Sequence, residues 1–145
     1  MSKEIAEALM IEAKSDLDAA KLLLNGEIYS RSIYHSQQAV EKAMKSCLAL
    51  AGIIITDDHR VSDRFADIFR EMSVEIVRDA KFLEHQGTRS RYPLFRDPSR
   101  SMWIPSREYT RDDAAGAYRK ADRIFSTITK LLEDKYGVVF GLMDF

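Results

Sequence analysis

Apolar residues recur every three or four positions along most of this chain, which is the pattern of amphipathic helices. Gly26, Gly52 and Gly137 follow three of the apolar stretches, in the position where glycine commonly ends a helix. The connection after the first stretch is short, so the first two helices are expected to pack antiparallel as a hairpin. The predicted helices span residues 3–25, 30–51, 61–71, 74–85 and 111–136.

These elements predict an all-α fold, an antiparallel up-and-down helical bundle of about five helices. A long loop rich in arginine, proline and aromatic residues precedes the last helix. The chain has 145 residues, which is enough for a single domain with its own hydrophobic core, so residues 1–145 are interpreted as one domain.

The second predicted helix has a polar stripe along the edge of its apolar face. Four positions fall within an arc of roughly 60° on a helix that advances about 100° per residue. They are Tyr34, Gln38, Glu41 and Lys45. The opposite side of the helix, predicted to face water, carries His35, Lys42 and Ser46. The stripe can bind a polar ligand or orient an arginine across a groove, or it can form a hydrogen-bond network between helices or between subunits.

Residues 86–110 hold all three prolines, the one tryptophan and five arginines of the chain. A connection this long without its own secondary structure is often functional. Guanidinium groups form forked hydrogen bonds to phosphate, and interleaved aromatic rings stack on bases. Arg91 is the first candidate for a phosphate or RNA contact, with Arg89 and Tyr92 beside it. The alternative is that these arginines pair with acidic residues of neighbouring helices.

Arg78 and His85 are seven positions apart, nearly two helical turns, and therefore share one face about 10 Å apart along the axis. An arginine there can hold a phosphate while the histidine transfers a proton. An exposed arginine and histidine without a chemical role are the alternative. His59 is interpreted as a capping residue, and no set of residues indicates a metal site or a bound cofactor.

Composition excludes several classes of protein. The net charge of −1 gives no general attraction to nucleic acid or acidic membranes, so any such attraction must be local. No apolar run approaches the roughly 20 residues that a membrane span needs, and no signal peptide is recognised. The lone Cys47 is expected to be a buried, reduced thiol of a cytoplasmic protein. Glycine-rich phosphate loops and nucleophile elbows are absent from the sequence.

Three segments together resemble the HEPN domain family (higher eukaryotes and prokaryotes nucleotide-binding domain). They are SIYHSQQAVEKAMKSCLALAG on the second helix, TDDHRV before the third, and SRYP after the fourth. The resemblance implies a helical bundle that is commonly a homodimer, often encoded beside a minimal nucleotidyltransferase in toxin–antitoxin pairs. Many members are ribonucleases that need no metal, and their motif is an arginine followed after four to six residues by a histidine.

Two placements of that motif are open. Arg78 and His85 have the family spacing, whereas Arg91 has Arg96, Asp97 and Pro98 where the histidine would stand. The leading hypothesis is a dimeric module that binds nucleotide or RNA and acts with a nucleotidyltransferase partner. A ribonuclease toxin that uses Arg78 and His85 is the second hypothesis, and a purely structural dimerisation module is the third.

Overall fold

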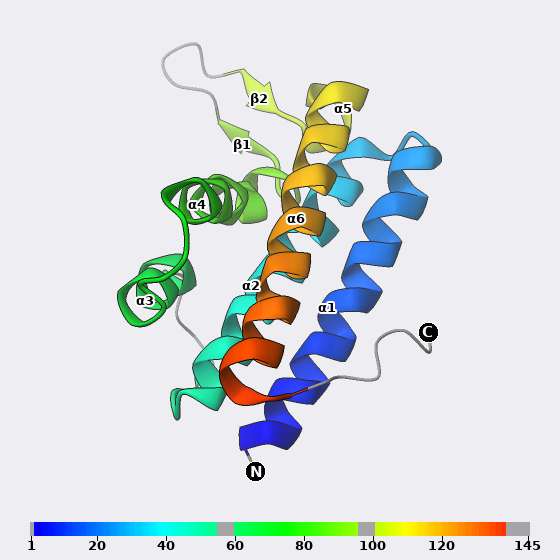
Figure 1. Cartoon of the computed structure of the whole chain (residues 1–145). Helices are drawn as coiled ribbons and strands as arrows, with labels where there is room; N and C mark the ends of the chain where they lie inside the picture. Colours follow the sequence, from blue (N-terminus) through cyan, green and yellow to red (C-terminus); the bar gives the residue numbers. More distant parts are fainter. Residues whose placement is uncertain (1, 55–59, 96–100, 139–145) are drawn as a thin grey trace.

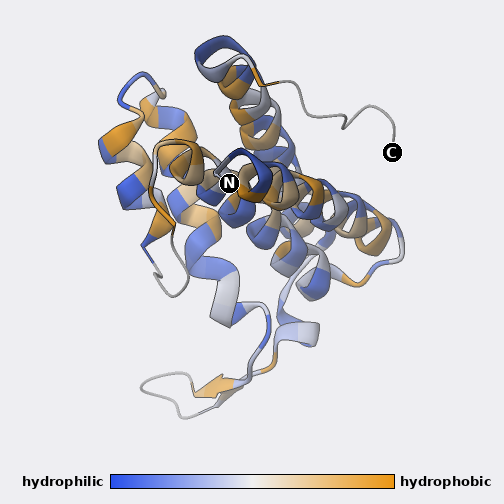
Figure 2. Ribbon diagram, turned by 90° about the horizontal axis from the view of Figure 1, so that it is seen from below, coloured by the Kyte–Doolittle hydropathy of each residue, from blue (hydrophilic) through white to orange (hydrophobic). Residues whose placement is uncertain are grey.

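Three long helices form the centre of the fold in this computed structural model, which describes residues 2–54, 60–95 and 101–138 (Figure 1). They are α1 (Ser2–Asn25), α2 (Tyr29–Leu50) and α6 (Arg111–Tyr136). Helix α1 runs antiparallel to α2 and α6, and α2 contacts α1, α3, α4, α5 and α6. Figure 2 shows the hydrophobic sides of these helices turned toward one another. The prediction of an all-α helical bundle is therefore confirmed.

Small side chains let α1 and α2 pack closely along their full length. Three alanines of α1 and three small residues of α2, each set spaced by seven positions, meet in antiparallel register. Two of these α2 residues are serines that donate their hydroxyl hydrogens to α1 carbonyls, Ser32 to Ala20 at 2.7 Å and Ser46 to Ala6 at 2.8 Å. The buried positions are Ala6, Ala13 and Ala20 on α1, and Ser32, Ala39 and Ser46 on α2.

Two shorter helices, α3 (Val61–Ile68) and α4 (Val74–Arg89), lie on the side of α2 away from α1. The hydroxyl of Ser73 caps α4 by accepting a hydrogen bond from the backbone N–H of Ile76 at 3.2 Å. Phe65 and Phe69 stack with their ring centroids 5.2 Å apart and are both fully buried. These contacts attach the α3–α4 pair to the core and place one side of α4 opposite α2.

The connection between α4 and α6 forms a small antiparallel hairpin and a single helical turn. Strands β1 (Leu94–Phe95) and β2 (Met102–Trp103) pair with Leu94 opposite Trp103, and α5 (Pro105–Glu108) follows. The indole N–H of Trp103 donates to the carbonyl of Arg89 at 2.7 Å, which ties the hairpin to the end of α4. The hairpin projects from the bundle with Phe95 78% exposed (Figure 2).

The structure refines several predicted boundaries and corrects one face. Six helices are described where about five were expected, because α5 lies in the segment predicted to be irregular. Helix α3 ends three residues earlier than predicted, since the chain must turn before Ser73 can cap α4. Helix α4 extends four residues beyond His85. The prediction that Ser46 faces water is wrong, because α1 covers that side of α2.

Some predictions fall outside the described residues or concern membranes. His59, Arg96 and Arg100 lie outside the residues that the structure describes. Within the described ranges, every helix is too short or too polar to cross a bilayer.

Candidate functional site

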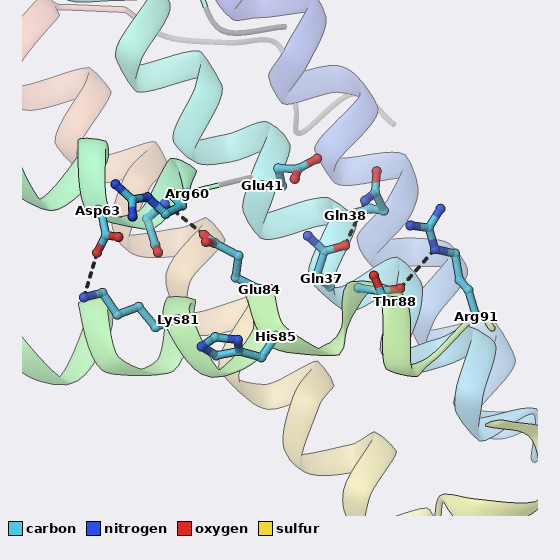
Figure 3. A pocket seen from close by; sticks show the side chains of 12 residues that line it. Gln37, Gln38, Glu41, Arg60, Asp63, Lys81, Glu84, His85, Thr88 and Arg91 are labelled. Carbon is cyan, nitrogen blue, oxygen red and sulfur yellow. Dashed lines mark hydrogen bonds and ion pairs between the residues drawn. The ribbon is translucent and has the colours of Figure 1, made fainter. Parts of the chain in front are cut away.

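A polar groove of about 580 Å³ lies between α2, the start of α3 and α4 (Figure 3). Its wall on the α2 side carries amide and carboxylate groups, and its wall on the α4 side carries charged and hydroxyl groups. The lining residues are Gln37, Gln38, Glu41, Arg60, Ser62, Asp63, Lys81, Glu84, His85, Gly87, Thr88 and Arg91. The groove therefore contains two members of the α2 stripe, Gln38 and Glu41, together with Arg91, which lies two residues beyond the end of α4.

Arg91 lies at the end of this groove, beside Gln38 (Figure 3). Its Nε–H donates to the carbonyl of Gly87 at 3.0 Å, and its guanidinium carbon lies 4.8 Å from the ring centroid of Tyr34. Tyr92 contacts the same guanidinium group at 5.0 Å. These contacts fix the plane of a permanently charged donor against the stripe of α2.

The other members of the predicted site are divided between this groove and its surroundings. Glu41 lines the groove, and Lys45 lies outside it with its Nζ 3.6 Å from Glu41 Oε2. Arg89 points to a different, smaller cavity of about 240 Å³, where its guanidinium carbon lies 4.4 Å from the Trp103 ring centroid. Arg89 and Arg91 therefore do not share a site.

Charges in the groove are mixed, and several already have partners. Lys81 Nζ lies 2.7 Å from Asp63 Oδ1, and its ammonium holds the pKa of that carboxyl below its usual value. Glu84 accepts a hydrogen bond from the backbone N–H of Ser62 at 2.9 Å, at the start of α3. These pairs fix the walls of the groove near α3, whereas Arg91 lies at its other end, near the α2 amides.

Arg78 and His85 share a side of α4 but line different hollows. His85 lines the polar groove, and among the described residues it has no hydrogen bond or ion pair. Arg78, with a 71% exposed side chain, lines an apolar hollow beside Phe69 and Val77. Lys81 lines both hollows and separates the two residues. The structure therefore does not bring the guanidinium of Arg78 and the imidazole of His85 into one cavity.

A hydrogen-bond chain crosses α2 from α1 to the groove. Asp16 accepts from Lys42 Nζ at 2.5 Å and lies 2.8 Å from His35 Nδ1. Lys42 Nζ also donates to Gln38 Oε1 at 3.2 Å, and Gln38 Nε2 donates to Gln37 Oε1 at 2.8 Å. His35 and Lys42, predicted to face water, are therefore half-buried and engaged with α1.

Sequence reasoning did not single out several lining residues. Gln37 is one of them, at 4% exposure, and its position beside Gln38 in the SIYHSQQ segment was the signal that could have identified it. Lys81, Glu84 and Thr88 lie on the α4 face that carries His85, and of these three only Thr88 lies beyond the end of the predicted helix. In the ranges that the structure describes, no three His, Cys, Asp or Glu side chains are grouped as a metal site.

Comparisons with known proteins agree with this architecture. The family model of the HEPN domain matches residues 6–132. The protein named "Putative toxin MJ1304" from Methanocaldococcus jannaschii is 36% identical over 143 residues, which cover 92% of this chain and 91% of that protein.

Two crystal structures have the same fold. A Thermus thermophilus protein matches with a TM-score of 0.74 and 26% identity over 90% of this chain and 98% of that one. An archaeal HEPN homologue matches with a TM-score of 0.69 and 29% identity over 88% of this chain and 97% of that one. With the family model covering residues 6–132, this chain belongs to the HEPN domain family.

Proposed function

We propose that the polar groove binds a nucleotide or a segment of RNA, with Arg91 as its principal phosphate contact. The observation that carries the proposal is the fixed guanidinium of Arg91, stacked on Tyr34 and held by the Gly87 carbonyl beside the α2 amides. A planar, permanently charged donor in a fixed orientation matches the geometry of a phosphate group.

The lining of the groove supports a ligand that carries both charge and polar edges. Gln37, Gln38 and Thr88 offer hydrogen-bonding groups, and the groove volume of about 580 Å³ is within the range of small-molecule sites. Because the whole chain has a net charge of −1, attraction of a phosphate must come from the local cations. Tyr92, next to Arg91 and 52% exposed, provides a ring on which a base can stack.

The cellular role that we propose is that of the toxin-like member of a pair, acting as a homodimer with a minimal nucleotidyltransferase. Two considerations support this role: the resemblance of the α2 segment to such family members, and a 36% identical relative that is named as a toxin. Light scattering of the purified chain tests the dimer. Co-expression with a nucleotidyltransferase encoded beside it tests the pairing, and failure of the two to co-purify would refute that pairing.

A second candidate activity is metal-independent RNA cleavage, and the position of His85 favours it. An imidazole without a partner among the described residues lines the same groove as Arg91, where it can transfer a proton to or from a bound RNA. In this hypothesis Arg78 stabilises the phosphate from the adjacent hollow, and the ribose 2′-hydroxyl supplies the nucleophile.

Binding is tested by titrating the protein with AMP and with a fluorescent single-stranded RNA at two salt concentrations. Arg91→Ala is expected to weaken binding at least tenfold, because a charged hydrogen bond to phosphate contributes about 1.5–3 kcal/mol. Arg119→Ala, which removes an exposed arginine on α6, is the matched control and should bind as the wild type does. Absence of wild-type binding to both probes would refute the proposal and favour the structural dimerisation module.

Cleavage is tested separately with the same RNA in EDTA. His85→Ala and Arg78→Ala should each abolish cleavage, with Arg119→Ala again as the control. Cleavage that persists in His85→Ala, or no cleavage by the wild type, would remove the ribonuclease hypothesis and leave the binding proposal intact.

A further inference from the structure

We infer that Gln37 Nε2 is a hydrogen-bond donor in the floor of the polar groove, and that Lys42 and Asp16 set its orientation from the far side of α2. The inference deepens the proposed function and rests on it, because it states what the bound ligand presents at this point: an acceptor oxygen, from a phosphate or from a base carbonyl.

The argument begins with a group that can donate only. The Lys42 ammonium has three N–H donors and no acceptor. It donates to Asp16 Oδ2 at 2.5 Å and to the side-chain amide of Gln38 at 3.2 Å. The Gln38 atom that faces Lys42 must therefore be the amide oxygen. Asp16 holds the ammonium in place, since its other oxygen lies 2.8 Å from His35 Nδ1.

The orientation of Gln38 then determines that of Gln37. With its oxygen toward Lys42, Gln38 turns its NH₂ group toward Gln37, whose Oε1 accepts at 2.8 Å. Gln37 is only 4% exposed, and among the described residues its Nε2 donates to no protein group. Figure 3 shows the Gln37 oxygen facing Gln38 and its nitrogen on the opposite side, in the groove.

A nearly buried amide donor must find an acceptor, because an unpaired polar group is costly in such a place. Water fills this role before binding, and a ligand oxygen fills it afterwards. The guanidinium of Arg91 and the hydroxyl of Thr88 line the same groove, so a phosphate placed there meets donors from α2 and from the end of α4. Asp16 and Lys42 are positioning residues, since neither lines the groove.

The test exchanges the two charges in the double variant Asp16→Lys/Lys42→Glu, which keeps an ion pair between α1 and α2. A carboxylate at position 42 can only accept, so Gln38 turns over and Gln37 presents its oxygen to the groove. Exchanging the exposed Lys14–Asp18 pair on α1, by Lys14→Asp/Asp18→Lys, is the matched control. Lys42→Arg keeps the donor and should behave as the wild type does.

Binding of three probes is measured for each variant by NMR titration. AMP carries a phosphate but no base carbonyl, uridine carries carbonyls but no phosphate, and adenosine carries neither. The double variant should lose about tenfold in affinity for whichever of AMP or uridine the wild type prefers, with adenosine unchanged. Equal affinities of the double variant and the wild type for AMP and for uridine would overturn the inference while leaving the proposed function intact.

Hydrogen exchange of the Gln37 side-chain amide provides a readout without ligand. In the wild type this NH₂ group faces the groove and should exchange quickly, whereas in the double variant it donates to Gln38 and should exchange more slowly. Identical exchange rates would refute the proposed orientation. A wild type that binds no probe would refute the proposed function and the ligand contact. In that case the hydrogen-exchange rates would be the one test of the Gln37 orientation.

Discussion

Three serines of α2 provide an internally matched test of the close contact between α1 and α2. Ser32, Ser36 and Ser46 are each fully buried on the same helix. Ser32 and Ser46 donate to α1 carbonyls, whereas Ser36 Oγ is buried without a hydrogen-bond partner among the described residues. Replacing each by alanine removes one oxygen in every case, so the variants differ in the hydrogen bond that is lost.

The two kinds of variant should change the free energy of unfolding in opposite directions. Ser32→Ala or Ser46→Ala loses a hydrogen bond whose net contribution is about 1–1.5 kcal/mol, offset by about 0.5 kcal/mol from the better helix propensity of alanine. Each should destabilise the protein by about 0.5–1 kcal/mol. Ser36→Ala removes a buried, unpaired hydroxyl and gains the same propensity, so it should stabilise the protein by about 1–2 kcal/mol.

Urea unfolding followed by circular dichroism at 222 nm measures these differences. The urea midpoints of two variants can be compared if the dependence of the free energy of unfolding on urea concentration, the m-value, is unchanged. The two groups should differ by about 2 kcal/mol, or about 4–8 °C in Tm for a chain of this length. The double variant Ser32→Ala/Ser46→Ala should show the sum of the single effects, because the sites are about 21 Å apart. Three indistinguishable single variants would refute the hydrogen-bond assignment.

Further predictions concern the same helices and the groove wall. Ala13→Leu inserts three carbons at a fully buried α1–α2 contact and should destabilise by about 1–3 kcal/mol in urea, whereas Ala8→Leu on the exposed side should not. Thr110→Ala removes the cap that accepts from the Asp113 N–H at 3.2 Å and should lower the free energy of unfolding by about 1 kcal/mol; an unchanged midpoint would refute the role of the cap. The pKa of Asp63 is lowered from 3.8 by Lys81, so its contribution to stability is present above that pH and is lost as the pH falls through the lower, folded-state pKa. Asp63→Asn should therefore be less stable than the wild type at pH 7, with a smaller difference at pH 3, and a difference independent of pH would contradict this.

The long helices were predictable because each has one apolar face and a glycine at its end. Helix α6 begins and ends as predicted, with Gly137 in the left-handed conformation at φ 63° that favours glycine. Helix α4 was underestimated because its last turn is polar and contains Gly87, so periodicity gave no reason to extend it. Two-residue strands such as β1 are too short to produce any periodic signal.

The faces of α2 were only partly predictable. This helix contacts α1 on one side and α3, α4 and α6 on others, so little of its surface remains for water. Ser46 and Lys42 are polar, but they face α1 and find partners there. Period-based reasoning treats a polar face as an exposed face, and this fails for a helix surrounded by other helices.

The site was predictable where a single segment carried the signal and unpredictable where segments meet. The α2 stripe and Arg91 each stood out in the sequence, and the structure places Gln38, Glu41 and Arg91 along one groove. The contribution of the α3 start, through Arg60 and Asp63, depends on how two short helices fold back on α2. That arrangement is a tertiary property that no local pattern encodes.

The seven-residue spacing of the α1–α2 contacts restricts how the molecule can move. A slide of one helix along the other by a single turn would place each serine hydroxyl away from its carbonyl, and a shift of about 10 Å, or seven residues, would bring only one of the two serines opposite another alanine of α1. The α1–α2 pair is therefore expected to behave as one rigid body. Any adjustment of the groove to a ligand must then come from the α3–α4 pair. The α2 wall of the groove is thus expected to stay fixed while the α4 wall moves.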